Sequence, residues 1–319
     1  MKRVLVTGAT GQIGSELTMA LRTRYGGDQV IAGGRKTKPS EALRNSGPFE
    51  AVDCLDSSAV AGVVRRYGVD TIYHLAAILS AVAEADPAHA WNVNINGLRN
   101  VLDAAREHRC AVFVPSSIGA FGASTPPNDT PQDTIQRPST MYGITKVAGE
   151  LLCDYYFTRF GVDTRGVRYP GIISHGTLPG GGTTDYAVEI YYEAIRRGRY
   201  TCYLAAGTFL DMMYMPDAIK AAISLMEADP GLLVHRNAFN VTALNFDPEI
   251  LARSIRAHIP EFTMAYQVDD VRQRIADSWP NHLDDSAACE QWGWKPDYDL
   301  DAMTGEMLAV LSEKLQQQE

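Results

Sequence analysis

A glycine-rich turn directly after the first strand constrains this 319-residue chain more than any other feature. The turn Gly8-Ala9-Thr10-Gly11-Gln12-Ile13-Gly14 follows the apolar run Val4–Thr7 and opens an amphipathic segment typical of a helix. Glycines here let backbone approach a pyrophosphate, and the helix N-terminus supplies N–H donors and partial positive charge. A tight turn that only packs the helix on the strand would use the same residues, but the strand–turn–helix context favours a dinucleotide site. We expect cofactor contacts from Gly8, Gly11, Gln12, Ile13 and Gly14.

Short apolar segments alternate with longer amphipathic segments through the first half of the chain. Strands are predicted at 4–7, 30–32, 49–53, 71–75, 111–115 and 163–169, and helices at 12–25, 57–67, 91–108 and 142–160. This rhythm predicts an α/β protein with a Rossmann doubly wound parallel sheet and a smaller, mainly C-terminal substrate-binding region. The dinucleotide domain is expected at 1–170 with a returning segment at about 207–242, and the substrate region at 171–206 and 243–319.

Composition excludes several classes of function. The formal net charge is -9 and no long basic run is present, so neither nucleic acid nor an anionic membrane is an expected partner. The five cysteines are scattered without a C-x-x-C pair, so we expect reduced thiols and no metal site. The first residues already read as a strand, and no apolar run approaches the roughly 18 residues that span a bilayer. A cytoplasmic location is the resulting expectation.

The end of the second strand normally decides between NAD and NADP. An acidic residue there bonds the ribose 2′-hydroxyl, whereas an arginine nearby accommodates a 2′-phosphate. This strand ends Ala32-Gly33-Gly34-Arg35-Lys36, without a carboxylate. Arg35 or Lys36 can accept a 2′-phosphate, or both can be solvated loop charges, so the residues alone leave the two cofactors open. Asp53, at the end of the third strand, can meet the adenine amino group or cap the helix that follows.

A tyrosine and a lysine supply the candidate catalytic pair. Tyr142 and Lys146 stand at i and i+4 of a predicted helix, which places them on one face. The lysine charge favours the tyrosinate form that a general base requires, and its ammonium can bond the nicotinamide ribose. Ser116 and Ser117 end the strand before this helix, and a hydroxyl there can hold a substrate oxygen. A chance Tyr-x-x-x-Lys is common, but the glycine turn, the serines and this pair in that order indicate an oxidoreductase.

The chain resembles the extended short-chain dehydrogenase/reductase superfamily over nearly its whole length. The resemblance rests on Gly8-x-x-Gly11-x-x-Gly14, Asp53, His74-Leu75-Ala76-Ala77, Asn94-x-x-Gly97-x-x-Asn100, Ser116-Ser117 and Tyr142-x-x-x-Lys146. It implies that Tyr142, Lys146 and Ser117 are catalytic. It also implies that the cofactor is contacted by the glycine-turn residues and by Gly34, Arg35, Asp53, Cys54, Leu75, Ala76, Ala77, Asn94, Tyr142, Lys146, Tyr169 and Ile172.

Two enzyme classes of this superfamily differ at one position. Nucleotide-sugar epimerases and dehydratases usually carry an arginine for the diphosphate, and Leu210 stands where it would be. The run 207–217 instead resembles the short-chain type of L-threonine 3-dehydrogenase, as do 74–80, 170–174 and above all 179–189. This resemblance implies oxidation of L-threonine to 2-amino-3-oxobutanoate, with NAD favoured over NADP, although the family usually has an acidic residue where this chain has Gly34. The epimerase/dehydratase class is the alternative.

The glycine-rich segment 170–185 is predicted to be a long loop, and its part 179–185 is expected to close over a small zwitterion. Three consecutive glycines can present N–H groups or form a hinge. Asp185 is either an acceptor for the substrate ammonium or an N-cap of the next helix. Substrate contacts are expected from Ser80, Ser116, Ser117, Tyr142, Gly180, Thr183, Thr184 and Asp185. The superfamily pairs the helices at 91–108 and 142–160 across a two-fold axis, so we expect a homodimer.

Overall fold

A six-stranded parallel sheet forms the centre of the N-terminal half in the computed structural model, which describes residues 1–178 and 182–317. The strand order is β3-β2-β1-β4-β5-β7, which reverses beside β1 as in doubly wound dinucleotide-binding sheets. The predicted α/β fold class is therefore confirmed. The strands are β1 (Val4–Thr7), β2 (Val30–Gly34), β3 (Phe49–Ala51), β4 (Thr71–His74), β5 (Ala111–Phe113) and β7 (Thr164–Arg165).

Different helices cover the two faces of this sheet. Val4 and Val6 point into one apolar cluster and Leu5 into the other, as the alternation of side chains along a strand requires. Full burial of each such side chain stabilises the fold by about 1.5–3 kcal/mol. The first cluster includes α1 (Gln12–Tyr25) and α9 (Met215–Glu227). The second includes α3 (Ser57–Tyr67), α6 (Leu98–His108) and α7 (Met141–Phe160).

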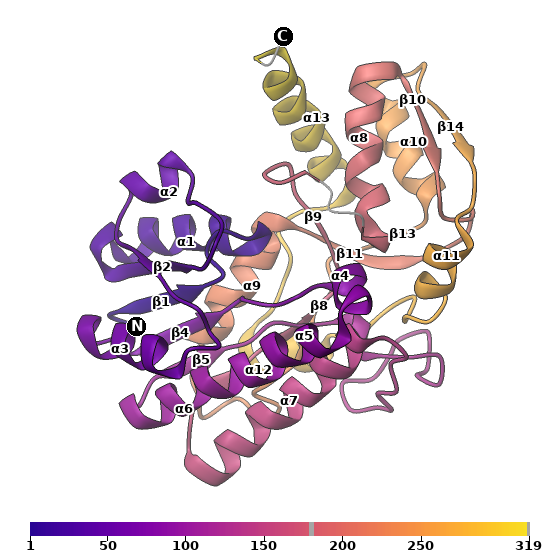
Figure 1. Ribbon diagram of the computed structural model, residues 1–319. Helices are drawn as coiled ribbons and strands as arrows, with labels where there is room; N and C mark the ends of the chain where they lie inside the picture. Colours follow the sequence, from indigo (N-terminus) through magenta and orange to yellow (C-terminus); the bar gives the residue numbers. More distant parts are fainter. Residues whose placement is uncertain (179–181, 318–319) are drawn as a thin grey trace.

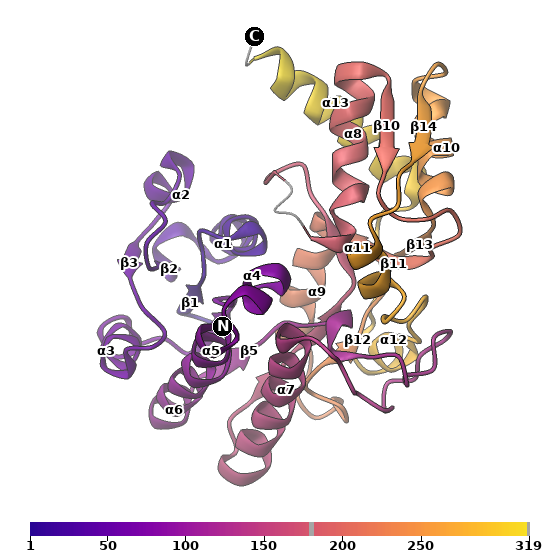
Figure 2. The same cartoon turned by 45° about the vertical axis from the view of Figure 1, so that its right-hand side comes forward.

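A second region lies on the opposite side of the molecule from α2 (Glu41–Asn45) and α3 in both views (Figures 1 and 2). Its apolar core draws on α8, α10 and α13. Its elements are β9 (Gly171–Ile173), α8 (Tyr186–Arg197), β10 (Arg199–Cys202), β11 (Leu210–Tyr214), β13 (Leu244–Phe246), α10 (Pro248–His258), β14 (Thr263–Tyr266), α11 (Asp270–Ala276) and α13 (Leu300–Gln316).

A separate small parallel sheet, in the order β12-β8-β6, packs with the first core. Its strands are β6 (Ser116–Ser117), β8 (Val167–Tyr169) and β12 (Phe239–Asn240), so it carries the two candidate serines. The helix α12 (Ser286–Trp292) was not foreseen, and it packs with the first core although it lies inside the segment 243–319.

Several predicted elements are interrupted in the structure. The helix expected at 91–108 divides into α5 (Pro87–Trp91), a π-helical turn Asn92–Gly97 and α6. Asparagine side chains compete with the backbone for hydrogen bonds, and Asn92, Asn94 and Asn96 all lie in this turn. The strand expected at 163–169 is split at Gly166, and the second strand extends to Gly34.

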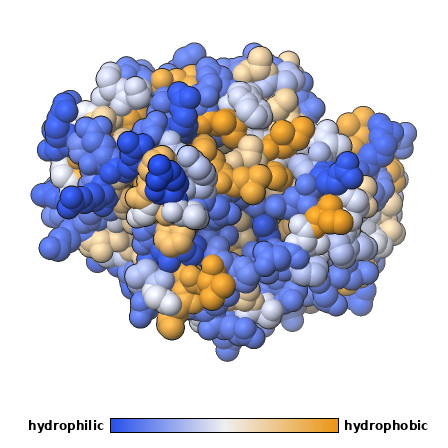
Figure 3. Space-filling model, turned by 90° about the horizontal axis from the view of Figure 1, so that it is seen from below, coloured by the Kyte–Doolittle hydropathy of each residue, from blue (hydrophilic) through white to orange (hydrophobic). Residues whose placement is uncertain are grey.

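Within residues 1–178 and 182–317, no helix has both the length and the apolar character to cross a bilayer. The view from below shows a mostly hydrophilic face with apolar side chains gathered near its middle (Figure 3). Exposed large apolar residues include Leu151 and Tyr155 on α7.

Candidate functional site

The glycine turn forms a cradle that only backbone can line. Gly8 has a φ of +73°, and a Cβ there would lie 2.7 Å from the main-chain nitrogen of Ala76. A Cβ on Gly14 would lie 2.1 Å from the carbonyl oxygen of Gly8. Gly11 is the N-cap of α1 and provides no side-chain acceptor for the first N–H groups of the helix. These donors suit a pyrophosphate, so the turn fits a dinucleotide.

The strand ends beside this turn bring small residues to the same edge of the sheet. Leu75 donates from its main-chain nitrogen to the carbonyl oxygen of Thr7, which continues the β1–β4 pairing to the turn. One cavity is lined by Leu75, Ala76 and Ala77 together with Asn94 and Lys146. The structure thus groups five of the candidate cofactor residues around one space.

His74 is a buried neighbour of this cavity. Its Nδ1 lies 2.8 Å from the hydroxyl of Thr7, across the β1–β4 pair. Burial, and secondarily the charge of Lys146, lowers the pKa of His74 to about 4. The ring is therefore neutral near pH 7 and acts as a hydrogen-bonding part of the sheet.

Asn94 lies in the π-helical turn and fastens the backbone after β4. Its amide oxygen accepts from the main-chain nitrogen of Ile78 at 2.8 Å, and its amide nitrogen donates to the carbonyl oxygen of Ile78 at 3.1 Å. The same nitrogen donates to the hydroxyl of Thr145 at 3.0 Å. Asn94 therefore links α7 to the segment that precedes Ser80. Ser80 is the first residue of α4 (Ser80–Ala85).

The far end of the candidate cofactor site lies where β2 and β3 end. Asp53 accepts from the main-chain nitrogen of Leu55 at 3.0 Å, and Nη1 of Arg35 lies 3.5 Å from its other oxygen. Cys54 is buried against Gly97, where a Cβ would lie 2.7 Å from its Sγ. The structure thus shows Asp53 engaged by main chain and by Arg35, and its predicted contact with adenine stays a prediction.

The helix α7, which carries the candidate catalytic pair, begins at a threonine cap. Thr140 accepts from the main-chain nitrogen of Gly143, which sets the start of the helix just before Tyr142. Lys146 donates from Nζ to the carbonyl oxygen of Pro115 at 2.7 Å, and its Nζ lies 5.4 Å from the centre of the Tyr142 ring. The predicted one-turn spacing therefore places the ammonium beside the tyrosine ring and at the end of the serine strand.

Gly119, which sequence reasoning missed, separates the candidate serine from the tyrosine. A Cβ on Gly119 would lie 3.3 Å from Cδ1 and Cε1 of Tyr142 and 3.5 Å from Oγ of Ser117. The hydroxyl of Ser117 also accepts from the main-chain nitrogen of Gly119 at 3.1 Å. A side chain at position 119 would therefore contact both Ser117 and Tyr142.

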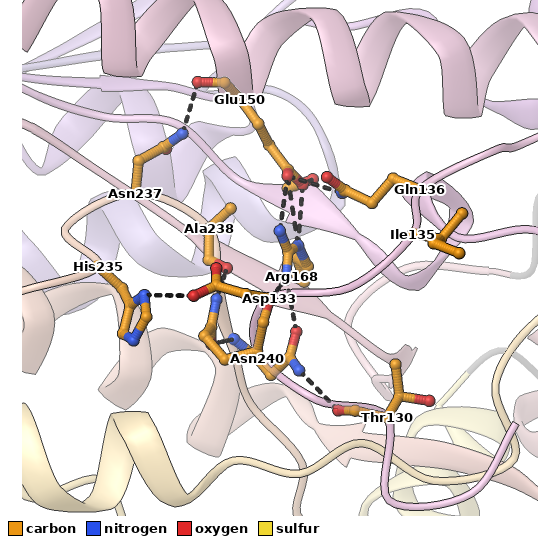
Figure 4. Close-up of polar contacts among 12 residues, drawn as sticks. Thr130, Asp133, Ile135, Gln136, Glu150, Arg168, His235, Asn237, Ala238 and Asn240 are labelled. Atoms are coloured by element: carbon orange, nitrogen blue, oxygen red, sulfur yellow. Dashed lines mark hydrogen bonds and ion pairs between the residues drawn. The ribbon is translucent and has the colours of Figure 1, made fainter. Parts of the chain in front are cut away.

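The side chain of Ser116 belongs to a buried polar network, whereas Ser117 points to the other face of the strand. The hydroxyl of Ser116 donates to the carboxylate of Glu150, which pairs with Arg168 at 2.9 Å; both charged side chains are at least nine-tenths buried. Figure 4 shows Glu150 and Arg168 at the centre of this network, with Gln136 and Asn240 as further partners. Glu150 follows Lys146 by one helical turn, so the network adjoins the candidate catalytic pair on the same helix.

The segment before α8 holds the remaining candidate substrate residues. Thr183 is buried, and Thr184 packs on Gly171, where a Cβ would lie 2.8 Å from its Cγ2. Asp185 accepts from the main-chain nitrogen of Gly182 at 2.7 Å. This bond caps the short helical turn Thr183–Asp185 that precedes α8, and the predicted contact of Asp185 with the substrate ammonium stays a prediction. Gly180 lies outside the described residues.

Two other residues predicted to contact the cofactor lie on β8 and β9. The hydroxyl of Tyr169 donates to the carbonyl oxygen of Ala218 at 2.6 Å, and burial raises the pKa of this tyrosine. Ile172 is partly buried and packs on the first core. Tyr169 therefore joins the small sheet to α9.

Comparison with known proteins identifies the family and the fold of the chain. The model of the NAD dependent epimerase/dehydratase family matches residues 4–241. An uncharacterized epimerase/dehydratase of Staphylococcus haemolyticus is 54% identical over 99% of both chains. The solved structure of an L-threonine dehydrogenase from Clostridium difficile is 58% identical, covers 98% of each chain and has a TM-score of 0.97. An L-threonine dehydrogenase from Phytophthora infestans is 49% identical, with 98% and 99% coverage and a TM-score of 0.94.

Proposed function

Because this chain belongs to the NAD dependent epimerase/dehydratase family, we propose that it oxidises L-threonine at the 3-hydroxyl to 2-amino-3-oxobutanoate with NAD. The observation that carries the proposal is the approach of Ser117 and Tyr142 to one another at Gly119, where an added Cβ would contact both side chains. Lys146 lies beside Tyr142 and also lines the cavity at the strand ends. The likeness to two threonine dehydrogenases, over nearly the whole chain, supports the choice of substrate.

In this proposal, three side chains of the protein have separate roles in the reaction. Ser117 donates a hydrogen bond to the substrate oxygen, and Tyr142 as tyrosinate removes the proton of the 3-hydroxyl. Lys146 stabilises the tyrosinate by its charge and holds the nicotinamide ribose. NAD, when bound along the glycine turn, supplies the acceptor for the hydride that leaves C3. The nearby apolar strand ends keep water away from this carbon.

The substrate's carboxylate and ammonium need partners of their own. We assign the carboxylate to the hydroxyls of Ser80, Thr183 and Thr184, which are neutral donors. Asp185 is assigned to the ammonium, because a carboxylate in a partly buried site stabilises a cation strongly. One oxygen of Asp185 accepts from the main-chain nitrogen of Gly182, which helps to hold the carboxylate in place.

Leu210 argues against a nucleotide-sugar substrate. It is fully buried in the second core, on β11 opposite Phe246. A diphosphate bound there would lack the arginine that epimerases and dehydratases place at this position, and an unpaired charge in an apolar environment is costly. The geometry therefore favours a small amino acid over a sugar nucleotide.

A spectrophotometric substrate panel tests the proposal. Reduced cofactor is followed with L-threonine, D-threonine, L-allo-threonine and a UDP-sugar, each with NAD. We expect turnover with L-threonine, far less with the stereoisomers, and no binding of the UDP-sugar by thermal shift. Stabilisation by the UDP-sugar without any threonine turnover would favour the epimerase class instead.

We also propose that the protein is a homodimer. Ile144, Leu151 and Tyr155 of α7 are exposed by 40%, 63% and 53%, and their spacing places them along one side of the helix. An apolar stripe of this kind is typical of a surface that pairs with a second copy. Light scattering at micromolar concentration is expected to give twice the 34.9 kDa chain mass, and a monomer mass would contradict dimerisation.

A further inference from the structure

We propose that the end of β2 forms a subsite for a phosphate on the 2′-oxygen of the adenosine ribose, so that the chain accepts NADP as well as NAD. Gly34 brings no carboxylate to this position, and Arg35 supplies a cation for the phosphate. The inference rests on the dinucleotide site of the proposed function, and it concerns the end of the cofactor remote from the chemistry.

The end of β2 is part of the dinucleotide site because it touches the glycine turn. Ala9 donates from its main-chain nitrogen to the carbonyl oxygen of Gly33 at 3.0 Å. A Cβ on Gly34 would lie 3.2 Å from Cγ2 of Thr10 and 3.0 Å from the ring of Phe49. A ribose held next to a pyrophosphate on the turn would therefore meet Gly34 and the residue that follows it.

No side-chain carboxylate at the end of β2 bonds a 2′-hydroxyl, because Gly34 stands where the acidic residue that selects NAD usually lies. Asp53, at the end of the neighbouring strand β3, is engaged by Arg35 and by the main-chain nitrogen of Leu55. A residue larger than glycine at position 34 would have to displace Phe49 or Thr10 by a few tenths of an ångström.

The Arg35 guanidinium lies at this strand end and forms only a weak ion pair there. Its Nη1 lies 3.5 Å from Asp53, and both side chains are more than one-third exposed. Such a pair contributes little to stability, so the guanidinium can exchange it for a closer, bidentate contact with a phosphate. Asp53 is itself fixed by Leu55, which keeps the arginine at the strand end rather than in open solvent.

The segment after β2 is positively charged, whereas the protein as a whole is negatively charged. Arg35, Lys36 and Lys38 are three exposed cations within four residues, in a chain of net charge -9. Concentrated positive charge at one edge of an acidic protein attracts an anion there. The ligand it fits is a phosphate monoester presented by the adenosine ribose.

Isothermal titration of the wild-type protein with adenosine 2′,5′-bisphosphate and with adenosine 5′-monophosphate tests the subsite without any turnover. We expect the bisphosphate to bind at least about tenfold more tightly. Arg35→Gln should reduce this ratio to about twofold or less while leaving the monophosphate affinity unchanged. Arg44→Gln, an equal charge change on the exposed face of α2, should leave the ratio intact.

Gly34→Asp provides a second variant that opposes the phosphate by charge, and it should lower the ratio while preserving monophosphate binding. Equal affinity of the wild type for both nucleotides, or a ratio that survives Arg35→Gln, would overturn the inference. Continued oxidation of threonine with NAD under that result would leave the proposed function standing. Absence of binding by either nucleotide would overturn both.

Discussion

Lys146 donates from Nζ to the carbonyl oxygen of Pro115 at 2.7 Å. This bond fixes the ammonium between the serine strand and the tyrosine ring, where its charge acts on Tyr142. Lys146→Met should therefore lower kcat by at least about 10²-fold with the fold retained. Lys220→Met is the control, because Lys220 also donates to a carbonyl oxygen, that of Lys295, but on an exposed surface. Unchanged kcat in Lys146→Met, measured by reduced-cofactor absorbance, would contradict the assignment.

Substitution of Gly119 should lower kcat much more than it lowers the stability of the fold. The methyl group of Gly119→Ala would lie 3.3 Å from the ring of Tyr142 and would displace the ring by a few tenths of an ångström. Misplacement of reacting groups by about 1 Å can cost 10²-fold in rate, so this smaller shift should lower kcat by roughly tenfold. Gly62→Ala, on the exposed side of α3 with nothing within 4 Å, should instead stabilise the fold by about 0.4–1 kcal/mol. Comparable kcat values in the two variants would refute the role of Gly119.

The ion pair between Glu150 and Arg168 should matter far more than a surface pair. Glu150→Ala leaves the Arg168 guanidinium buried without its partner, which costs about 3–5 kcal/mol in free energy of unfolding. Glu193→Ala removes the exposed pair with Arg197 and should cost about 0.5 kcal/mol or less. Urea denaturation at neutral pH measures both, and similar losses would show that the buried network is not a structural support of the site.

His74 should make the protein sensitive to acid. Burial and the charge of Lys146 lower its pKa to about 4 in the folded state, against about 6.5 when unfolded. The unfolded chain therefore binds a proton first as the pH falls, and about 3 kcal/mol of stability is lost between pH 6.5 and pH 4. His74→Asn, which keeps a polar group near Thr7, should flatten this part of the profile. Parallel pH profiles of unfolding for wild type and variant would contradict the burial effect.

Local patterns in the sequence were enough to predict the first strand, the glycine turn and α1, because all their constraints lie within 25 residues. The one-turn spacing of Tyr142 and Lys146 and the strand at Ser116–Ser117 were likewise predicted and appear on α7 and β6. The π-helical turn in the predicted helix was missed because helical periodicity does not register an inserted residue.

Long-range contacts account for most of what the sequence did not reveal. Ser116 and Glu150 are 34 residues apart, and Arg168 and Asn240 are 72 apart, so no local pattern links them. The importance of Gly119 depends on the approach of α7, which becomes visible only when Gly143 meets the carbonyl oxygen of Gly119. The only local hint of this role in the sequence was that a glycine stands two residues after Ser117.

The origin of the transferred hydride tests the central claim most directly. L-threonine deuterated at C3 is incubated with NAD and the protein, and the reduced dinucleotide is analysed by mass spectrometry. Oxidation at the 3-hydroxyl predicts a reduced cofactor one mass unit heavier with this substrate, and an unlabelled one with L-threonine deuterated at C2. Deuterium transferred from C2, or no labelled cofactor from either substrate, would contradict the account.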